Sequence, residues 1–430
     1  MMLPNVDREP TPRVAARVRL TNSIVLGALV LAACTGIDRP LAPDRTATAL
    51  GDTPPARAAG AGCDLTLTEI FHLALPDADG DRLPDCVETN TKVFAGISNT
   101  GTDPNDPDTD GDNISDGDEV LGTRLGLDLP ALGVNPLRQD ILLEYDWFDD
   151  ALDGCGPHSH RPTAAMIARV SAAFAQGPVQ NPDGTTGIHV ISDYGQGGVF
   201  TGGNLVSATA GVLAGQVGGA DYRAYKGANF DANRNGYFHY VLMPHRYLLT
   251  SASSGQAEIN GDDLIVSLQC FITVVNVANT IMHELGHNLG LRHGGFEDVN
   301  YKPNYNSVMN YLYQFPGIDT DCTPPGNGLL SYSVGARPAL NENHVDEREG
   351  VCGNPPGPPW DWNGDGDAAD FGFAFNLNPL NDDVLGILRD FDDWGHLNFG
   401  GIGDASGVGV EAFAAREIVS CMNTPGSREQ

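Results

Sequence analysis

The sequence predicts an α/β (α+β) fold, in which a twisted sheet packs against helices and a loop-rich lower subdomain follows. Between residues 139 and 290, runs of β-branched and aromatic residues alternate with runs whose apolar residues recur at helical spacing. After about residue 294, Gly, Pro and Asn dominate and regular structure becomes sparse. Two Asp-rich loops come before the sheet and indicate a small N-terminal module. The order of these elements indicates a sheet with its helices packed against it.

The composition is that of an acidic globular protein. With 430 residues and 41% hydrophobic content, the chain is long and apolar enough to form a substantial core. Its 24 basic and 56 acidic side chains give a formal net charge of -32, which repels nucleic acid and anionic lipid and attracts divalent cations. We therefore expect no nucleic-acid partner, and the sequence indicates no oligomeric state.

Residues 1–34 have the pattern of a signal peptide. Arginines precede the apolar run IVLGALVLAA (24–33), which is too short to span a bilayer permanently. The following LAAC resembles a bacterial lipobox, which implies cleavage before Cys34 and lipidation of Cys34; the alternative is an ordinary cleaved signal. Residues 35–62 are rich in Ala, Pro, Thr and Arg and predict a flexible tether. We expect an exported protein held at the bacterial cell envelope, at the outer membrane or cell surface, only through this lipid anchor, or else secreted.

Two acidic loops share one spacing and predict calcium sites. DADGDRLPDCVE (77–88) and DTDGDNISDGDE (108–119) both carry acids at positions 1, 3, 5, 9 and 12. Calcium takes about six to eight oxygen ligands, which such a loop can supply together with one backbone carbonyl. The loops resemble EF-hand loops and, more closely, thrombospondin type 3 repeats, although their glycines stand at position 4 and not at position 6. The alternative is an acidic solvated linker. The candidate ligands in the predicted module (63–125) are Asp77, Asp79, Asp81, Asp85, Glu88, Asp108, Asp110, Asp112, Asp116 and Glu119.

The region after residue 136 has the pattern of ordinary strands and helices. Its last helix is amphipathic, runs through FITVVNVANTIMHELGHNLG and ends at Gly290. The other expected elements are a buried strand at 139–148, a helix at 163–176 and strands at 187–194, 237–245 and 263–268.

HELGHNLGLRH (283–293) predicts a zinc site. His283 and His287 lie one turn apart on one helix face, and Gly290 can break the helix so that His293 returns as a third ligand. Three neutral imidazoles leave the fourth tetrahedral position of Zn²⁺ for water. Glu284 is placed to accept a proton from that water, which indicates hydrolysis without a covalent intermediate. The alternative is a core helix that happens to carry histidines.

This motif and the downstream SVMNY (307–311) resemble the metzincin clan of zinc metallopeptidases. The resemblance covers residues from about 137 to 400 of a predicted domain at 135–421. It implies an extended substrate along an edge strand, for which DLIVSL (263–268) is the candidate. Gly294 matches neither the Glu of astacins nor the Pro of serralysins and so indicates no branch. The resemblance implies His283, His287 and His293 as zinc ligands and Glu284 as the general base. It implies Met309 as the hydrophobic floor under the metal. It also implies Tyr311 as a zinc ligand that can swing away to stabilise the intermediate; the alternative for Tyr311 is a packed aromatic.

Two further segments are weaker candidates for cation binding. DWNGDGDAAD (361–370) places acids or amides at positions 1, 3, 5 and 7, which makes it a candidate third calcium loop. DANRNG (231–236) favours a hairpin turn. The candidate ligands of the third loop are Asp361, Asn363, Asp365 and Asp367.

The remaining cysteines and histidines complete the pattern. Export predicts disulfides, and proximity favours Cys63 with Cys86 and Cys322 with Cys352. Apart from Cys34 the cysteine count is odd, so one is unpaired or paired elsewhere. No partner motif surrounds His158, His160 and His245, which we interpret as ordinary surface or strand histidines.

Together these features predict an exported, lipid-anchored zinc endopeptidase with a calcium-stabilised module, acting on protein or peptide substrates with Zn²⁺ and Ca²⁺ as cofactors. A calcium-binding surface adhesin or binding lipoprotein with a structural or degenerate zinc site is the main alternative. Glu284 favours the enzyme, because a structural site needs no base. A third hypothesis keeps the enzyme and makes peptidoglycan cross-bridges its substrate.

Overall fold

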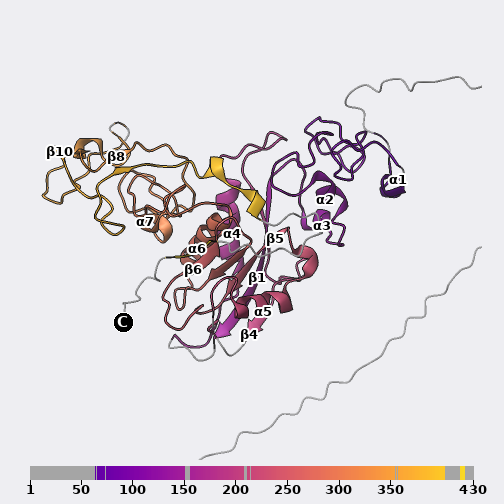
Figure 1. Ribbon diagram of the computed structural model, residues 1–430, viewed down its shortest axis with the longest axis horizontal. Helices are drawn as coiled ribbons and strands as arrows, with labels where there is room; N and C mark the ends of the chain where they lie inside the picture. The colour runs from indigo at the N-terminus through magenta and orange to yellow at the C-terminus, as the bar shows by residue number, and fades with distance from the viewer. Residues whose placement is uncertain are drawn as a thin grey trace, which may run out of the picture. The chain divides into compact units, whose positions relative to one another are not determined.

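The described part of the chain begins after the predicted tether. The computed structural model (Figure 1) describes residues 63, 65–72, 74–150, 155–207, 211–213, 215–353, 355, 357–401 and 417–421. The predicted signal peptide, Cys34 and the tether lie outside these residues. Within them, no helix is long and apolar enough to cross a membrane.

An eight-stranded mixed sheet forms the centre of the fold, built around the long strand β1 (Asp140–Asp150). Its neighbours on β1 are β3 (His189–Asp193), β4 (Leu205–Ser207) and β5 (Phe238–Met243), all parallel, and β2 (His158–Ser159), antiparallel. Beyond β5 come β7 (Asp263–Val266), parallel, and then β6 (Gly255–Glu258) and β12 (Ile418–Ser420), both antiparallel.

Both faces of this sheet are covered. Along β1, Ile141 and Leu143 face one core while Leu142 and Phe148 face another, and all four are buried. Such a strand has a continuous apolar run because neither side meets water.

Helices provide the cover on each face. α4 (Ala164–Ala175) and α6 (Val274–Asn288) pack together on one face (Figure 1). Tyr222 of α5 (Ala220–Asn229) belongs to the core of the opposite face. The hydroxyls of Thr163 and Thr273 accept hydrogen bonds from the third residue beyond each, so both α4 and α6 begin with a side-chain cap.

The lower part of the chain contains only short elements, as its composition predicts. They are α7 (Tyr311–Gln314), β8 (Leu340–Asn341), β9 (Val345–Asp346), β10 (Phe371–Phe373), β11 (Ile387–Leu388) and three short 3₁₀ turns (Glu347–Glu349, Trp394–His396 and Phe399–Gly401).

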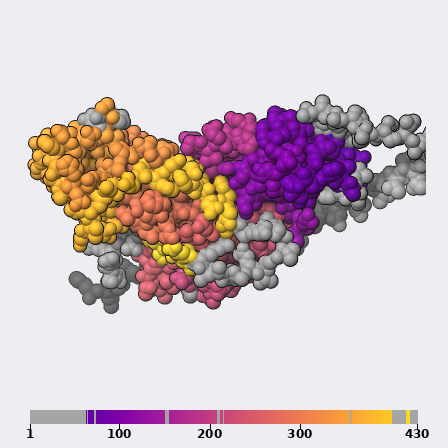
Figure 2. Space-filling view, turned by 45° about the horizontal axis from the view of Figure 1, so that its top comes forward, coloured from indigo at the N-terminus to yellow at the C-terminus, as the bar shows by residue number. Residues whose placement is uncertain are grey.

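The Asp-rich module, indigo in Figure 2, is tied to the start of β1. It contains α1 (Leu67–His72), α2 (Asp116–Leu121) and α3 (Leu129–Leu132). The Asp140 backbone N–H donates to Asp112 Oδ2 over 2.6 Å, and Gln139 Nε2 donates to the Asp110 carbonyl over 2.9 Å. The second acidic loop is therefore part of the packing around the central strand.

Three disulfides lie in the described residues. Cys63–Cys86 and Cys322–Cys352 confirm the two pairings expected from proximity. The third, Cys155–Cys270, joins residues 115 positions apart, a separation that proximity in sequence could not reveal. Cys421 is the one left unpaired among the described cysteines, and it is buried. This bonding pattern is that of an oxidising, extracytoplasmic compartment.

Two sequence-based expectations are wrong. DLIVSL does not form the sheet edge, because β7 lies between β5 and β6, and β12 pairs with the far side of β6. β6, the next strand toward that edge, lacks β-branched residues. DANRNG is not a hairpin turn but contains a 3₁₀ turn (Ala232–Arg234) that connects α5 to β5. Arg234 is buried there between Glu144, at 2.5 Å, and Asp193, at 2.6 Å, so the segment has a structural role.

Candidate metal centre

α6 carries the first two candidate ligands on its buried side. His283 and His287 are both fully buried, and their ring centroids are 4.9 Å apart. Residue 286 lies between them and is glycine, because a Cβ atom at that position would stand 2.3 Å from Met309 Sδ. Met309 is thus packed directly against the helix that presents the histidines, where the Met-turn resemblance implies it.

The third histidine returns through a glycine turn. Gly290 has a φ of 91°, and its N–H donates to the His287 carbonyl over 2.9 Å. The His293 ring centroid consequently lies 4.8 Å from that of His287 and 5.4 Å from that of His283. The structure therefore brings together the three histidines predicted as ligands.

Hydrogen bonds and burial leave these imidazoles ready to bind a cation. His283 Nδ1 is 2.7 Å from the Val308 carbonyl, and His287 Nδ1 is 2.8 Å from the Leu291 carbonyl. Because a carbonyl only accepts, each Nδ1 carries the proton and each Nε2 presents a lone pair. Burial also lowers the pKa of all three rings, that of His287 to about 4, so they are neutral near pH 7. Their chemistry fits Zn²⁺.

A fourth donor closes the set. Cys421 Sγ lies 3.1, 3.6 and 4.0 Å from the Nε2 atoms of His283, His287 and His293, respectively. In a tetrahedral zinc site, with Zn–S of about 2.3 Å and Zn–N of about 2.0–2.1 Å, sulfur and nitrogen ligands stand about 3.6 Å apart. The expectation of a fourth position left to water is therefore wrong for this conformation. The only signal in the sequence was the odd cysteine count.

Glu284 is directed at the same fourth position. Its carboxyl group is fully buried, and Oε2 accepts a hydrogen bond from Cys421 Sγ over 3.1 Å. Oε1 has no hydrogen-bond partner within the described residues. A Cβ on Gly255 would stand 2.1 Å from Oε1, so β6 can approach the carboxyl group only because residue 255 is glycine. Burial raises the pKa of Glu284.

Tyr311 borders the site. Its ring centroid lies 4.4 Å from that of His293, and its hydroxyl donates to the Ser420 carbonyl over 2.9 Å. Burial raises the pKa of this phenol, so the hydroxyl remains protonated. The Tyr311 ring thus lies against a ligand histidine. In this conformation its hydroxyl is bonded to the segment that carries Cys421.

Comparisons with known proteins give a weak structural similarity. No protein-family profile matches the chain, and no curated protein matches it. Among solved structures it is similar to an archaemetzincin from Methanopyrus kandleri, with 17% sequence identity and a TM-score of 0.23. The match covers 40% of this chain and 81% of that chain. A TM-score this low does not establish a shared function, so the function must be inferred from the geometry of the site itself.

The three acidic loops share one internal hydrogen-bond pattern. In each, the first Asp accepts from the backbone N–H groups at positions 4 and 6, and the side chain at position 5 accepts from the N–H at position 7. The first positions are Asp77, Asp108 and Asp361. The fifth positions are Asp81, Asp112 and Asp365. The candidate third loop, Asp361 to Asp370, thus folds like the other two.

The first two loops carry buried carboxylate oxygens that no described group satisfies. These are Asp79 Oδ2, Asp81 Oδ2, Glu88 Oε2, Asp110 Oδ2 and both Glu119 oxygens. Asp140, which the sequence did not single out, adds its charge to those of Asp110 and Asp112. In the first loop, burial and the charges of neighbouring carboxylates such as Asp79 raise the pKa of Asp81 to about 7 and that of Glu88 to about 9. A bound cation would satisfy such oxygens, so these residues fit the calcium hypothesis.

The sequence predicts His158, His160 and His245 as ordinary surface or strand histidines, and the structure shows in addition that they lie close together. Their ring nitrogens converge at one point, although His245 follows His160 by 85 residues. Sequence spacing could not show this, because the antiparallel pairing of β2 with β1 and the end of β5 bring them together.

Proposed function

We propose that this chain is an exported zinc-dependent endopeptidase in which His283, His287 and His293 hold the ion and Glu284 is the general base. The observation that carries the proposal is the buried Glu284 carboxyl, directed at the fourth position of a three-histidine site. A buried carboxyl group with one oxygen unpaired among the described residues is costly unless it serves a purpose, and a structural zinc site has no use for it.

Each group has a role in hydrolysis. When bound, zinc supplies Lewis acidity that polarises the substrate carbonyl and activates water. Glu284 takes the proton from the attacking water and passes it to the leaving amine. Tyr311, whose hydroxyl stays protonated, can donate to the oxygen that becomes negative in the tetrahedral intermediate. The neutral histidines keep the pocket free of competing positive charge.

The substrate would bind as a strand. β6 presents its free edge beside Glu284 when β12 is absent, and an extended peptide can add to such an edge through backbone hydrogen bonds. This assigns to β6 the role that was expected of DLIVSL. Recognition mainly through the backbone fits a protein or peptide substrate.

A structural site in a surface adhesin is the rival, and Cys421 favours it, because four protein ligands with no open position are the pattern of structural zinc sites. The two functions differ in their dependence on Glu284. We expect Glu284→Gln, made in a Cys421→Ala protein, to lower casein hydrolysis by about 100-fold or more while zinc content is unchanged. The exposed Glu349→Gln is the control and should leave hydrolysis unchanged. Absence of hydrolysis in the Cys421→Ala protein itself would favour the adhesin.

We also propose that calcium occupies the acidic loops and that Cys34 anchors the protein to a membrane by lipidation. The orphaned carboxylate oxygens support the first proposal, and the lipobox resemblance supports the second.

A further inference from the structure

We propose that His158, His160 and His245 form a second zinc site, separate from the centre on α6. The Nε2 atoms of His158 and His160 are 3.0 Å apart, and His245 Nδ1 lies 3.4 Å and 3.3 Å from them. Nitrogen ligands of a tetrahedral zinc, at about 2.0–2.1 Å from the ion, stand about 3.3 Å from one another. The three nitrogens are therefore already at the separation that the ion requires.

The protonation pattern also favours a cation. His158 Nδ1 is 2.7 Å from the Gly156 carbonyl and must donate to it, so His158 Nε2 turns a lone pair toward the other two rings. A single hydrogen bond among these three nitrogens would join only two of them. One cation, in contrast, can accept a lone pair from all three. A backbone carbonyl that fixes the tautomer is the usual support of a ligating histidine.

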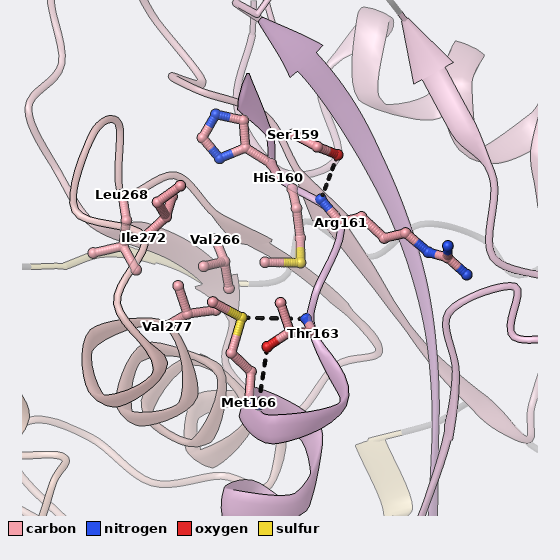
Figure 3. A pocket seen from close by; sticks show the side chains of 10 residues that line it. Ser159, His160, Arg161, Thr163, Met166, Val266, Leu268, Ile272 and Val277 are labelled. Atoms are coloured by element: carbon pink, nitrogen blue, oxygen red, sulfur yellow. Dashed lines mark hydrogen bonds between the residues drawn. The ribbon is translucent and has the colours of Figure 1, made fainter. Parts of the chain in front are cut away.

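The surroundings hold these rings in place. His160 and His245 are 5% and 2% exposed, and the His160 N–H donates to the Phe148 carbonyl on β1. The Cys155–Cys270 disulfide lies beside them, and because both sulfurs are in that bond they are not thiolate ligands. Figure 3 shows His160 at a cavity of about 90 Å³, lined also by Arg161 and by apolar side chains. His158 and His245 do not line this cavity. The three atoms that converge are all imidazole nitrogens, which suit zinc better than calcium.

Zinc stoichiometry tests this site without reference to activity. The full chain, carrying Glu284→Gln to prevent self-hydrolysis, is saturated with Zn²⁺ in excess Ca²⁺, desalted and analysed by mass spectrometry of the metal. We expect His160→Ala and His245→Ala each to bind one zinc fewer than the parent, and the exposed His344→Ala to match it. Equal zinc in all four proteins would overturn the proposal. If the variants do not fold, Co²⁺ titration of the parent should show two tetrahedral binding events, and a single event would overturn it.

A different observation carries a second inference, which rests on the proposed function: residues 417–421 keep the α6 centre latent, with the Cys421 thiolate as fourth ligand. β12 pairs antiparallel with β6, in register from Ile418 with Glu258 to Ser420 with Gln256. The pairing continues at both ends, where Ile259 N–H donates to the Glu417 carbonyl over 2.8 Å and Cys421 N–H donates to the Gly255 carbonyl over 3.1 Å. This segment thus occupies the edge on which we expect the substrate.

Side chains of the site hold the same segment. Tyr311 donates to the Ser420 carbonyl, and Ser253 Oγ donates to the Cys421 carbonyl over 2.6 Å. Arg292, next to the ligand His293, forms an ion pair with Glu417. The proposed base and the proposed oxyanion donor are therefore both engaged by residues 417–421. Opening breaks the bond between sulfur and metal, returns a proton from solvent to the thiol and frees the fourth position, so it needs no oxidant or reductant.

Cys421→Ser in a Cys34→Ser full-length protein tests latency, with Cys34→Ser alone as the control. We expect peptide hydrolysis to rise about tenfold or more. In the Co²⁺-loaded control we expect a thiolate-to-cobalt charge-transfer band that Cys421→Ser abolishes. Glu417→Gln, which removes only the ion pair, should raise hydrolysis by a smaller factor and keep the band.

The outcomes separate this inference from the function on which it rests. Full hydrolysis by the control with no thiolate band would overturn latency and leave the peptidase proposal standing. A strong band in the control with no hydrolysis by Cys421→Ser would instead contradict the peptidase and make the centre a structural one.

Discussion

Two glycines set the geometry of the α6 centre at the scale of single residues. Gly255 lets β6 approach Glu284, and Gly286 lets Met309 pack beneath the ligand helix. Neither glycine has a positive φ. Their role is therefore steric: each marks a place where a Cβ atom would displace a functional group.

Substitution of Gly286 tests this role. In Gly286→Ala, the new Cβ overlaps Met309 Sδ, so we expect the free energy of unfolding to fall by about 1–3 kcal/mol, as for other overpacked cores. Zinc affinity should fall as well, because the overlap lies between His283 and His287. Denaturant unfolding and zinc competition titration measure the two effects. Gly227→Ala in α5 is the matched control, since nothing lies within 4 Å of its Cβ. It should stabilise the protein by about 0.5–1 kcal/mol; equal effects of the two changes would contradict the steric role.

The candidate centre also shows which residues a sequence can reveal. His283, Glu284, His287 and His293 lie within eleven residues, so their spacing alone predicts a common site. Cys421 joins them from 128 residues beyond His293, and no local pattern marks it. Asp140 and the convergence of His158 with His245 were missed for the same reason.

At the scale of elements, periodicity predicted the parts that bury a regular apolar face. α4, α6 and β1 each begin and end within about three residues of the expected bounds. β6 was missed because Gly-Gln-Ala-Glu carries no strand signal, although all four of its residues are buried. Its polar residues are satisfied through tertiary contacts, such as that of Gln256 with the Val217 backbone N–H. The edge of the sheet was therefore misassigned to β7, whose composition is that of a typical strand.

The acidic loops give a prediction in which pH and calcium act together. In the calcium-free protein, Asp81 and Glu88 have pKa values of about 7 and about 9, above their ordinary values. Groups with raised pKa values favour the folded state below their unfolded pKa, and this contribution is lost as the pH rises through the folded values. We therefore expect the calcium-free protein to lose thermal stability between about pH 5 and about pH 8.

Calcium should reverse this trend, because it replaces the protons on the carboxylates and binds more tightly as they ionise. Melting curves with calcium or a selective chelator, at both pH values, measure the difference, and calcium should stabilise the protein more at the higher pH. Identical curves with and without calcium would remove the calcium hypothesis. Asp361→Asn in the third loop provides a comparison, since its neighbours are more exposed.

At the scale of the whole molecule, the Cys155–Cys270 disulfide is the longest-range covalent constraint among the described residues. It closes a segment of 115 residues that includes β2 to β7. Since longer closed loops restrict the unfolded chain more, we expect the double change Cys155→Ser and Cys270→Ser to lower the free energy of unfolding by about 2–5 kcal/mol.

Denaturant unfolding measures this loss. The corresponding change at Cys63 and Cys86, whose loop spans 23 residues, is the control and should cost less. The reverse order would mean that local packing, and not chain restriction, dominates. The double change at Cys155 and Cys270 should also weaken zinc binding by the nearby histidines, because the disulfide lies beside the loop that carries His158.

Release of β12 would have a cost beyond the active site. Once residues 417–421 leave, the backbone N–H and C=O groups of β6 that paired with them have no hydrogen-bond partner. Such unpaired groups pair with strands from other molecules. Activated molecules at high concentration should accordingly associate and cleave one another, whereas molecules that keep β12 in place should not.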